Sequence, residues 1–383
     1  MNKTIKNLLL CVMFFILSAC SGFFDKDNTP NPSPLVNFSP EAKIATRYYT
    51  KTNSGVGKDY LKLSAAVTDD TIFTADKDGK VTASFKATGK TKWQVNLRTG
   101  ISAGVAADEN IVVVGTHDGE VIALNSDTGA QIFKVKASSE ILAKPAIQHD
   151  VVLVKAIDGK ISAFDKNDGH LLWAYEQTEP SLILRGASMP ATQDHMTVAG
   201  FANGNLAKLT IEGGSLQWQT MIAQPQGSFA IERMIDIDAD PVISASRVFA
   251  ATYQGHIVSL DYLTGREIWA HDISSYTGMT VDDEKVYISD AKSAIWAFNR
   301  DTGAVSFRQV DLGARNITAP VIIGNYIVVG DGEGFLHWLS REDGHFVARI
   351  RMNRSRILAT PVVDNGILYV VSTDGHLAAY SLA

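Results

Sequence analysis

The sequence predicts an all-β fold, an eight-bladed β-propeller built from four-stranded antiparallel blades. Two observations lead to this prediction. A repeat recurs eight times along the chain, and its first turn moves from Gly79 to Gly375 in seven steps over 296 residues, which gives a period of about 42. Each copy alternates strand-length β-branched or aromatic runs with glycine turns. Four short strands in a repeat of this length are typical of a propeller blade.

The second copy of the repeat shows each element clearly. Ile111 to Val114 is a β-branched run, Asp118-Gly119 reads as a hairpin turn, and Val121 to Leu124 is the returning strand. Thr128-Gly129 then turns the chain into a strand that carries Phe133. Glycine suits both turns because it accepts a positive φ. Upstream segments, such as residues 143–147 and 319–323, are predicted to supply the fourth, innermost strand of a blade.

An aromatic residue stands four positions after the second glycine in six of the seven complete copies, and we expect it to fill the gap between adjacent blades. The eighth copy ends after its third strand. Residues 44–50, with Tyr48 and Tyr49, precede the first complete blade and are predicted to supply the missing outer strand and its aromatic. This pairing would close the ring and remove two exposed strand edges.

The N-terminus is predicted to be a signal peptide over residues 1–19. Its apolar stretch, Leu8 to Leu17, is too short to span a bilayer, which needs roughly 20 residues. The sequence Leu17-Ser18-Ala19-Cys20 resembles the lipobox of bacterial lipoproteins, which implies lipidation of Cys20. Ordinary cleavage near Ala19 is the alternative. By the same resemblance, Ser21 in place of Asp indicates the outer membrane.

The remaining chain divides into a tether and a single domain. Residues 20–40 contain four prolines and are predicted to be flexible, and residues 41–383 are predicted to form the propeller. The mature chain has no disulfide, because Cys11 leaves with the signal peptide and Cys20 would be acylated. A net charge of −6 argues against a nucleic-acid partner.

Two neighbouring connections between blades are longer than the others. From the aromatic of one blade to the proline that opens the next there are ordinarily 12 or 13 residues, but Trp173 to Pro190 is 17 and Trp218 to Pro241 is 23. Equivalent insertions emerge on one face of a propeller and, in consecutive blades, build one local surface. Loops on a rigid scaffold commonly carry the binding site, so we expect a site around residues 175–189 and 223–240.

Five residues in these insertions are candidates for partner binding. Leu182, Leu184 and Arg185 place an apolar pair beside a cation, which is a plain interface pattern. The alternative is that both leucines tuck under the loop. Asp236 and Asp238 share a face if the chain is extended, and they would bind a partner or orient an arginine. Turn capping and ordinary solubility are their other interpretations.

The repeat Ala-x-Asp-x-x-Thr-Gly-x-x-x-Trp resembles that of pyrroloquinoline-quinone (PQQ) dehydrogenases, and the whole chain is more similar to the BamB (YfgL) lipoproteins. The similarity to BamB covers the lipobox, the tether, all eight blades, and residues 54–57, 180–186 and 233–238. It implies an outer-membrane lipoprotein on the periplasmic face, a membrane partner through its lipid, and binding to the POTRA domains of BamA. Unfolded outer-membrane proteins are a further candidate partner through β-augmentation.

The sequence offers no pattern typical of an enzyme. It lacks the vicinal cysteine pair of PQQ dehydrogenases and any spaced histidine pair for zinc, so we expect no cofactor, no metal and no catalytic residue. A PQQ-dependent dehydrogenase and another periplasmic propeller lipoprotein remain the alternatives to a BamB-like scaffold. Four arginines near the last blade are expected to form a solvated basic rim, with contact to an acidic partner as the alternative: Arg349, Arg351, Arg354 and Arg356.

Overall fold

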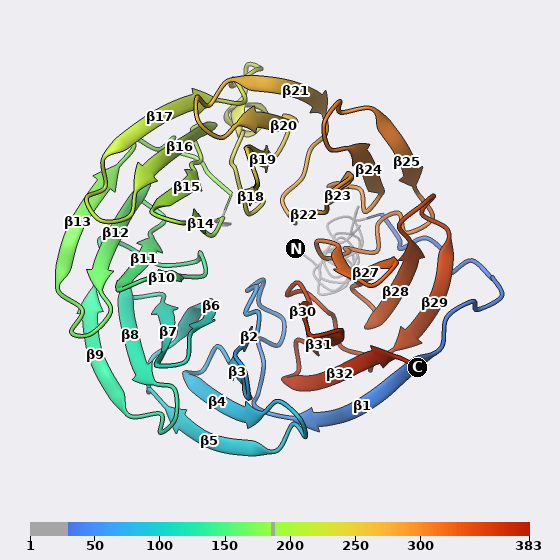
Figure 1. The fold of residues 1–383 in the computed structure, drawn as a ribbon, viewed down its shortest axis with the longest axis horizontal. Helices are drawn as coiled ribbons and strands as arrows, with labels where there is room; N and C mark the ends of the chain where they lie inside the picture. Colours follow the sequence, from blue (N-terminus) through green and yellow to red (C-terminus); the bar gives the residue numbers. More distant parts are fainter. Residues whose placement is uncertain (1–29, 185–187) are drawn as a thin grey trace, which may run out of the picture. The chain divides into compact units, whose positions relative to one another are not determined.

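Eight four-stranded antiparallel sheets are arranged around a central axis in the structure, a computed structural model that describes residues 30–184 and 188–383 (Figure 1). The predicted eight-bladed all-β propeller is therefore confirmed. The predicted signal peptide and Cys20 lie outside the described residues. Within the described ranges, no helix combines the length and the apolar composition that crossing a bilayer requires.

Each blade is a meander that runs outward from the axis. Blades 1–4 contain β2 (Ala66–Val67), β3 (Thr71–Ala75), β4 (Lys80–Phe85), β5 (Thr91–Asn96); β6 (Ile101–Ala107), β7 (Ile111–Thr116), β8 (Glu120–Asn125), β9 (Gln131–Lys136); β10 (Ala146–Gln148), β11 (Val151–Lys155), β12 (Lys160–Asp165), β13 (Leu171–Glu176); and β14 (Ala191–Gln193), β15 (Met196–Gly200), β16 (Asn205–Thr210), β17 (Leu216–Met221).

Blades 5–8 follow the same order, and the last blade takes its outer strand from the N-terminal region. They contain β18 (Val242–Ser244), β19 (Arg247–Ala251), β20 (His256–Asp261), β21 (Glu267–Asp272); β22 (Met279–Val281), β23 (Lys285–Ser289), β24 (Ile295–Asn299), β25 (Val305–Gln309); β26 (Val321–Ile323), β27 (Tyr326–Gly330), β28 (Phe335–Ser340), β29 (Phe346–Arg351); and β30 (Val362–Asp364), β31 (Ile367–Val371), β32 (His376–Leu382), β1 (Ile44–Lys51).

Burial follows the position of a strand within its blade. All six residues of β7 are buried, whereas β9 at the rim of the same blade leaves four of its six residues exposed. The core therefore lies between the blades, because the middle strands pack on neighbours on both faces. The innermost strands are shorter than predicted: β10 and β26 start directly after Pro145 and Pro320. Proline has no N–H to donate to the ladder, so pairing begins one residue later.

The recurring aromatic packs against the second glycine of the following blade. The Trp93 indole lies so close to Gly129 that a Cβ on this glycine would be 2.7 Å from the ring, and the Trp93 Nε1 donates to Ser126 O at 2.8 Å. Gly129 also has a φ of +72°, a value that favours glycine. The same contact joins seven pairs of residues: Tyr48–Gly89, Trp93–Gly129, Phe133–Gly169, Trp173–Gly214, Trp218–Gly265, Trp269–Gly303 and Phe307–Gly344.

The ring closes as the sequence predicts. Strand β1 pairs antiparallel with β32, from Ile44 opposite Leu382 to Lys51 opposite His376. Tyr48 takes the place of the blade aromatic, since its ring meets Gly89 and its hydroxyl donates to Lys86 O at 3.0 Å. Blades 8 and 1 are therefore joined by the same contact as the other pairs.

The two rims of the propeller carry different loops. The Asp-Gly turns lie against the connections that lead to the next blade, as Gly79 does against Thr99 O, and we call this rim the loop face. The Thr-Gly turns lie on the other rim, which we call the opposite face, because successive strands run antiparallel.

Residues 33–42 differ from the flexible tether that proline content predicts for residues 20–40. This segment, here called the strap, packs along blades 6 and 7, and its Val36 and Phe38 join the hydrophobic cluster between them. Two arginines that are remote in sequence, Arg315 and Arg349, donate to carbonyls of the strap. Such contacts leave no local sequence signature, which is why composition alone missed them.

The basic cluster near the last blade is only partly the solvated rim that the sequence predicts. Arg351 and Arg354 are exposed. Arg349 instead lies under the strap, with its guanidinium carbon 4.9 Å from the Phe38 ring centre. Arg356 is half-buried and donates to Lys58 O at 3.1 Å. The prediction of a solvated rim is therefore wrong for Arg349, because the strap covers it.

Candidate functional site

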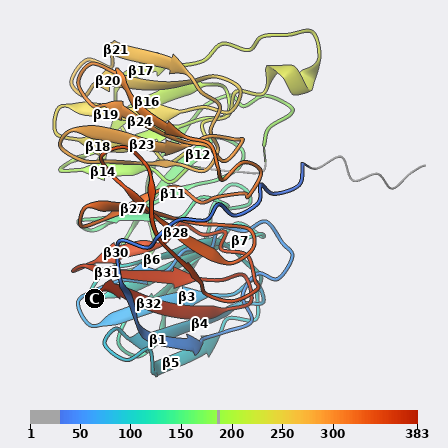
Figure 2. The same cartoon turned by 90° about the vertical axis from the view of Figure 1, so that its right-hand side faces the viewer.

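The two long connections predicted from the sequence form adjoining loops on the loop face. The first insertion, residues 177–190, joins β13 to β14, and the second, residues 222–241, joins β17 to β18. The second contains the one-turn 3-10 helix η1 (Ala230–Arg233). Figure 2 shows the loop with η1 projecting beyond the strands on one side of the ring.

Side chains and main chain of the two insertions bind each other. Asp236 Oδ1 accepts a hydrogen bond from Leu184 N at 2.9 Å, and Asp240 Oδ1 accepts one from Met189 N at 2.7 Å. The buried Ser188 hydroxyl donates to Ile237 O at 2.7 Å. The insertions therefore form one continuous surface, although they belong to different blade junctions.

The two predicted leucines differ in exposure. Leu182 is 44% exposed, so it can reach a partner. Leu184 is half-buried and lines the central cavity, which agrees with the alternative that a leucine tucks under the loop. Arg185 lies outside the described residues.

The two aspartates differ from the expectation of a surface pair. Asp236 is 2% exposed and Asp238 is 7% exposed, so neither presents its carboxylate on the outer surface. The physical reason is that the extended segment 234–239 runs beneath the loops and is buried throughout. Alternation along an extended segment could not reveal this burial, because it depends on the loops that cover the segment. Asp236 supports the first insertion instead.

Two exposed apolar residues in the second insertion escaped the sequence analysis. Phe229, the residue before η1, is 69% exposed, and Ile231 within η1 is 61% exposed. Glu232 holds this turn, because its Oε2 accepts hydrogen bonds from Ser228 N and Phe229 N at 2.9 and 3.0 Å. An apolar pair in the largely polar stretch of residues 224–233, within an unusually long connection, is the signal that would have found them. Exposed aromatics of this kind are common anchors at interfaces.

A cavity of about 420 Å³ opens in the central channel beside the insertions. Its lining includes Leu184 and Asp238 from the insertions, together with Tyr60, Lys62, Lys144 and Tyr276. The insertions therefore line part of the wall of the central channel. Surface and cavity are therefore contiguous.

The charges beneath the insertions are closely packed and partly unsatisfied. Burial, with the neighbouring Asp238 charge, raises the pKa of Asp236 to about 7, and burial raises the pKa of Asp238 to about 6. Lys62 and Lys155 partly offset the shift at Asp238, while burial lowers the pKa of Lys155 itself. Asp236 Oδ2 has no hydrogen-bond partner among the residues that the structure describes. Buried, underpaired carboxylates are more typical of functional sites than of cores.

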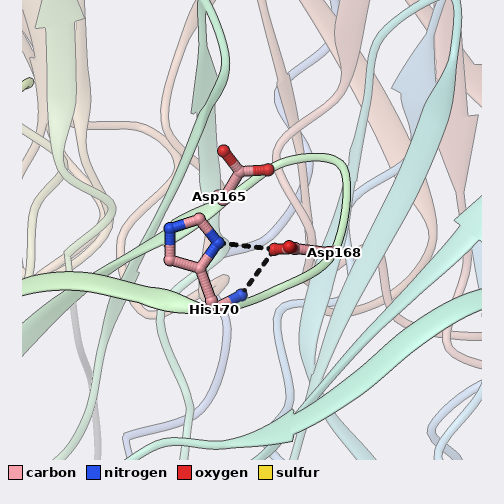
Figure 3. A group of neighbouring side chains, drawn as sticks. All are labelled: Asp165, Asp168 and His170. Carbon is pink, nitrogen blue, oxygen red and sulfur yellow. Dashed lines mark hydrogen bonds and ion pairs between the residues drawn. The ribbon is translucent and has the colours of Figure 1, made fainter.

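A separate group of three potential metal ligands lies on the opposite face. Figure 3 shows Asp165, Asp168 and His170 in the turn between β12 and β13, with Asp168 Oδ1 accepting hydrogen bonds from His170 N at 2.9 Å and His170 Nδ1 at 2.7 Å. Asp343 and His345 repeat the same two contacts in blade 7. We therefore assign the group to the architecture of the turn.

Comparisons with known proteins agree on one family. The model of the family described as outer membrane protein assembly factor BamB matches residues 77–309 and 308–383. The BamB proteins of Legionella pneumophila and Alkalilimnicola ehrlichii are 39% and 42% identical to this chain, covering 98% of it and 99% and 96% of their own lengths. The Escherichia coli BamB is 34% identical, with 94% of each chain covered.

Solved structures give the same result at the level of the fold. The crystal structure of Moraxella catarrhalis BamB superposes with a TM-score of 0.82 at 29% identity, covering 88% of this chain and all of that one. A quinohemoprotein alcohol dehydrogenase from Comamonas testosteroni superposes at 0.69 with 13% identity, over 88% of this chain and 76% of that one, which shows a shared fold alone. The chain belongs to the BamB family of outer membrane protein assembly factors.

Proposed function

We propose that the chain is a non-enzymatic scaffold subunit of the machinery that assembles β-barrels in the outer membrane. In this proposal a lipid on Cys20 holds it at the periplasmic face, and its partner is the POTRA region of BamA. The names of its relatives as assembly factors support this role. The lipobox-like sequence that ends in Cys20 supports the anchor.

The pair of joined insertions is the observation that carries the proposal. Leu182, Phe229 and Ile231 are exposed apolar side chains on one loop face, and they come from loops whose lengths set blades 3 to 5 apart from the rest. Exposed apolar residues with a polar surround are typical of protein interfaces. A propeller supplies the rigid base that such loops need.

The buried aspartates have a supporting role in this proposal. Asp236 fixes the main chain at Leu184, two residues from the exposed Leu182. A loop held in its binding conformation loses less conformational entropy when a partner binds. Loss of the Asp236 carboxylate oxygen would therefore weaken binding indirectly.

Co-purification with BamA from detergent-solubilised envelopes tests the proposal. We expect Leu182→Asp to reduce the recovered BamA strongly, because a charge would be buried at the interface. Leu216→Asp is the matched control, since Leu216 is 47% exposed on β17 outside the insertions. Arg185→Glu, which the sequence singles out, is measured beside them. Full recovery of BamA with Leu182→Asp, or its absence with the unmodified chain, would contradict the proposal.

A further inference from the structure

The strap is bound to the propeller by main-chain hydrogen bonds at both of its ends. At its start, Ser33 N donates to Gly313 O at 2.9 Å and Arg315 Nη1 donates to Ser33 O at 2.8 Å. At its end, the amides of Glu41 and Ala42 donate to Val347 O at 2.9 and 3.2 Å. A merely flexible tether would make none of these contacts.

The middle of the strap is held by packing and by a second arginine. Phe38 stacks on Phe346 with ring centres 5.7 Å apart, and Arg349 lies against the Phe38 ring. Arg349 Nη1 also donates to Val36 O at 3.0 Å. The strap is therefore bound through apolar, cation–π and polar contacts together.

A buried network orients the two arginines toward the strap. Asp331 Oδ2 accepts from Arg315 Nε at 2.8 Å and from His337 Nε2 at 2.9 Å, and all three side chains are at most 2% exposed. Arg349 Nε donates to His337 Nδ1 at 3.2 Å, so the His337 proton is on Nε2, facing Asp331. In each guanidinium, Nη1 donates a hydrogen bond to a carbonyl of the strap. Buried charges of this kind are costly, which favours a specific role over stability alone.

The start of the strap, at Ser33, lies on the loop face, the rim that also carries the two insertions. Gly313 lies in the connection from β25 to β26, which is equivalent to the connections that contain the insertions. This junction of blades 6 and 7 is two blades from the second insertion and three from the first. In Figure 2 the strap, in blue, runs toward the side of the ring on which the loop with η1 projects.

We propose that Arg315, Arg349 and Phe346 form a docking site for the chain's own strap. The part of the chain between Cys20 and the docked strap, here called the leash, then joins the propeller at Ser33 on the loop face. The inference rests on the proposed lipid anchor at Cys20. From Cys20 to Ser33 are 13 residues, a reach of at most about 47 Å, against about 86 Å for the 24 residues to Ile44. Docking therefore shortens the leash and turns the loop face toward the membrane.

Hydrogen exchange of the lipidated full chain in vesicles of phosphatidylethanolamine and phosphatidylglycerol tests the docking itself. We expect the Ser33, Glu41 and Ala42 amides to be protected, and Val36→Asp with Phe38→Asp to speed their exchange about tenfold or more. Asn37→Asp is the matched control, because Asn37 is exposed in the strap. Exchange at the unprotected rate in the unmodified chain would overturn the inference, as would no change in the double variant.

Energy transfer to a lipid acceptor in the same vesicles tests the orientation. The mature chain has no cysteine besides Cys20, so a single introduced cysteine takes the label cleanly. Asp118→Cys labels the loop face and Asp127→Cys the opposite face of the same blade, and both aspartates are exposed. We expect stronger energy transfer from position 118 than from position 127. This difference should be smaller in the variant with Val36→Asp and Phe38→Asp. Equal transfer from both positions, or a difference that the strap variant leaves unchanged, would overturn the inference.

The two readouts separate this inference from the proposed function. A chain that fails to recover BamA but shows a protected strap and a loop face turned to the vesicle would contradict the proposed partner and leave the leash intact. A chain that recovers BamA but shows an exposed strap would contradict the leash alone. A thermal unfolding curve of each variant shows that the propeller remains folded.

Discussion

Asp236 leads to a prediction about pH. Its carboxylate accepts the hydrogen bond from Leu184 N, but its ionisation lowers the stability of the folded chain. Its pKa is raised to about 7 in the folded chain, first by burial and then by the charge of Asp238. The ordinary value for an aspartate is 3.8. Between these values the folded chain binds a proton that the unfolded chain has lost, so stability falls as the pH rises from about 4 to about 7 and stays low above it.

The magnitude follows from the shift. Between pH 5 and pH 7 the loss is two pH units at about 1.36 kcal/mol each, which is about 2.7 kcal/mol. For a unit of about 350 residues, an unfolding entropy of about 2.1 cal/mol/K per residue gives about 0.7 kcal/mol/K. The corresponding change in Tm is about 4 °C. Local rearrangement of the protein around the ionised carboxylate lowers the cost of its burial and reduces this change toward 2 °C.

The perturbation is Asp236→Asn, which cannot ionise but keeps an oxygen for Leu184 N. We expect the Tm of the variant, relative to the unmodified chain, to be about 2–4 °C higher at pH 8 than at pH 5. Circular dichroism melts at both pH values measure this, with the exposed Asp118→Asn as control. A variant that is equally destabilised at both pH values would refute the reasoning, because the ionised carboxylate would then not be costly.

Two further predictions concern the packing between blades and the network under the strap. Trp93→Ala should lower the Tm by about 3–4 °C, because it empties the contact with Gly129 and removes about 2–3 kcal/mol of half-buried packing; an unchanged melt would show that this aromatic does not join the blades. Burial, with Arg349 nearby, lowers the pKa of His337, so the folded chain keeps this ring neutral and loses stability as the pH falls below about 6.5. His337→Gln should therefore lose less Tm between pH 7 and pH 5 than the unmodified chain, and an equal loss would contradict the assigned network.

Features that depend on local repetition could be predicted from the sequence. The period of about 42 residues, the two turns and the aromatic determine the blades, and the incomplete last copy requires a strand from the N-terminal region. The structure pairs β1 with β32 accordingly and places Tyr48 on Gly89. These elements follow from nearest-neighbour rules, because every blade packs on the next one in the same way.

Features that depend on contacts between distant segments could not be predicted. The strap binds Arg315 and Arg349, some 280 and 310 residues away, so composition suggested only a flexible segment. Alternation placed Asp236 and Asp238 on one side of the chain, but only the packing of the insertions decides that this side is buried. Loop length indicated the candidate site, whereas the exposure of Phe229 became visible only in the structure.

The central claim is that the joined insertions are the surface that binds the partner. Its most direct measurement is calorimetric titration of the purified propeller with the POTRA domains of BamA, for the unmodified chain, Leu182→Asp and Leu216→Asp. The account predicts that Leu182→Asp raises the Kd about tenfold or more, as expected for loss of an interface anchor, and that Leu216→Asp leaves it unchanged. Equal Kd values for all three chains would contradict the claim.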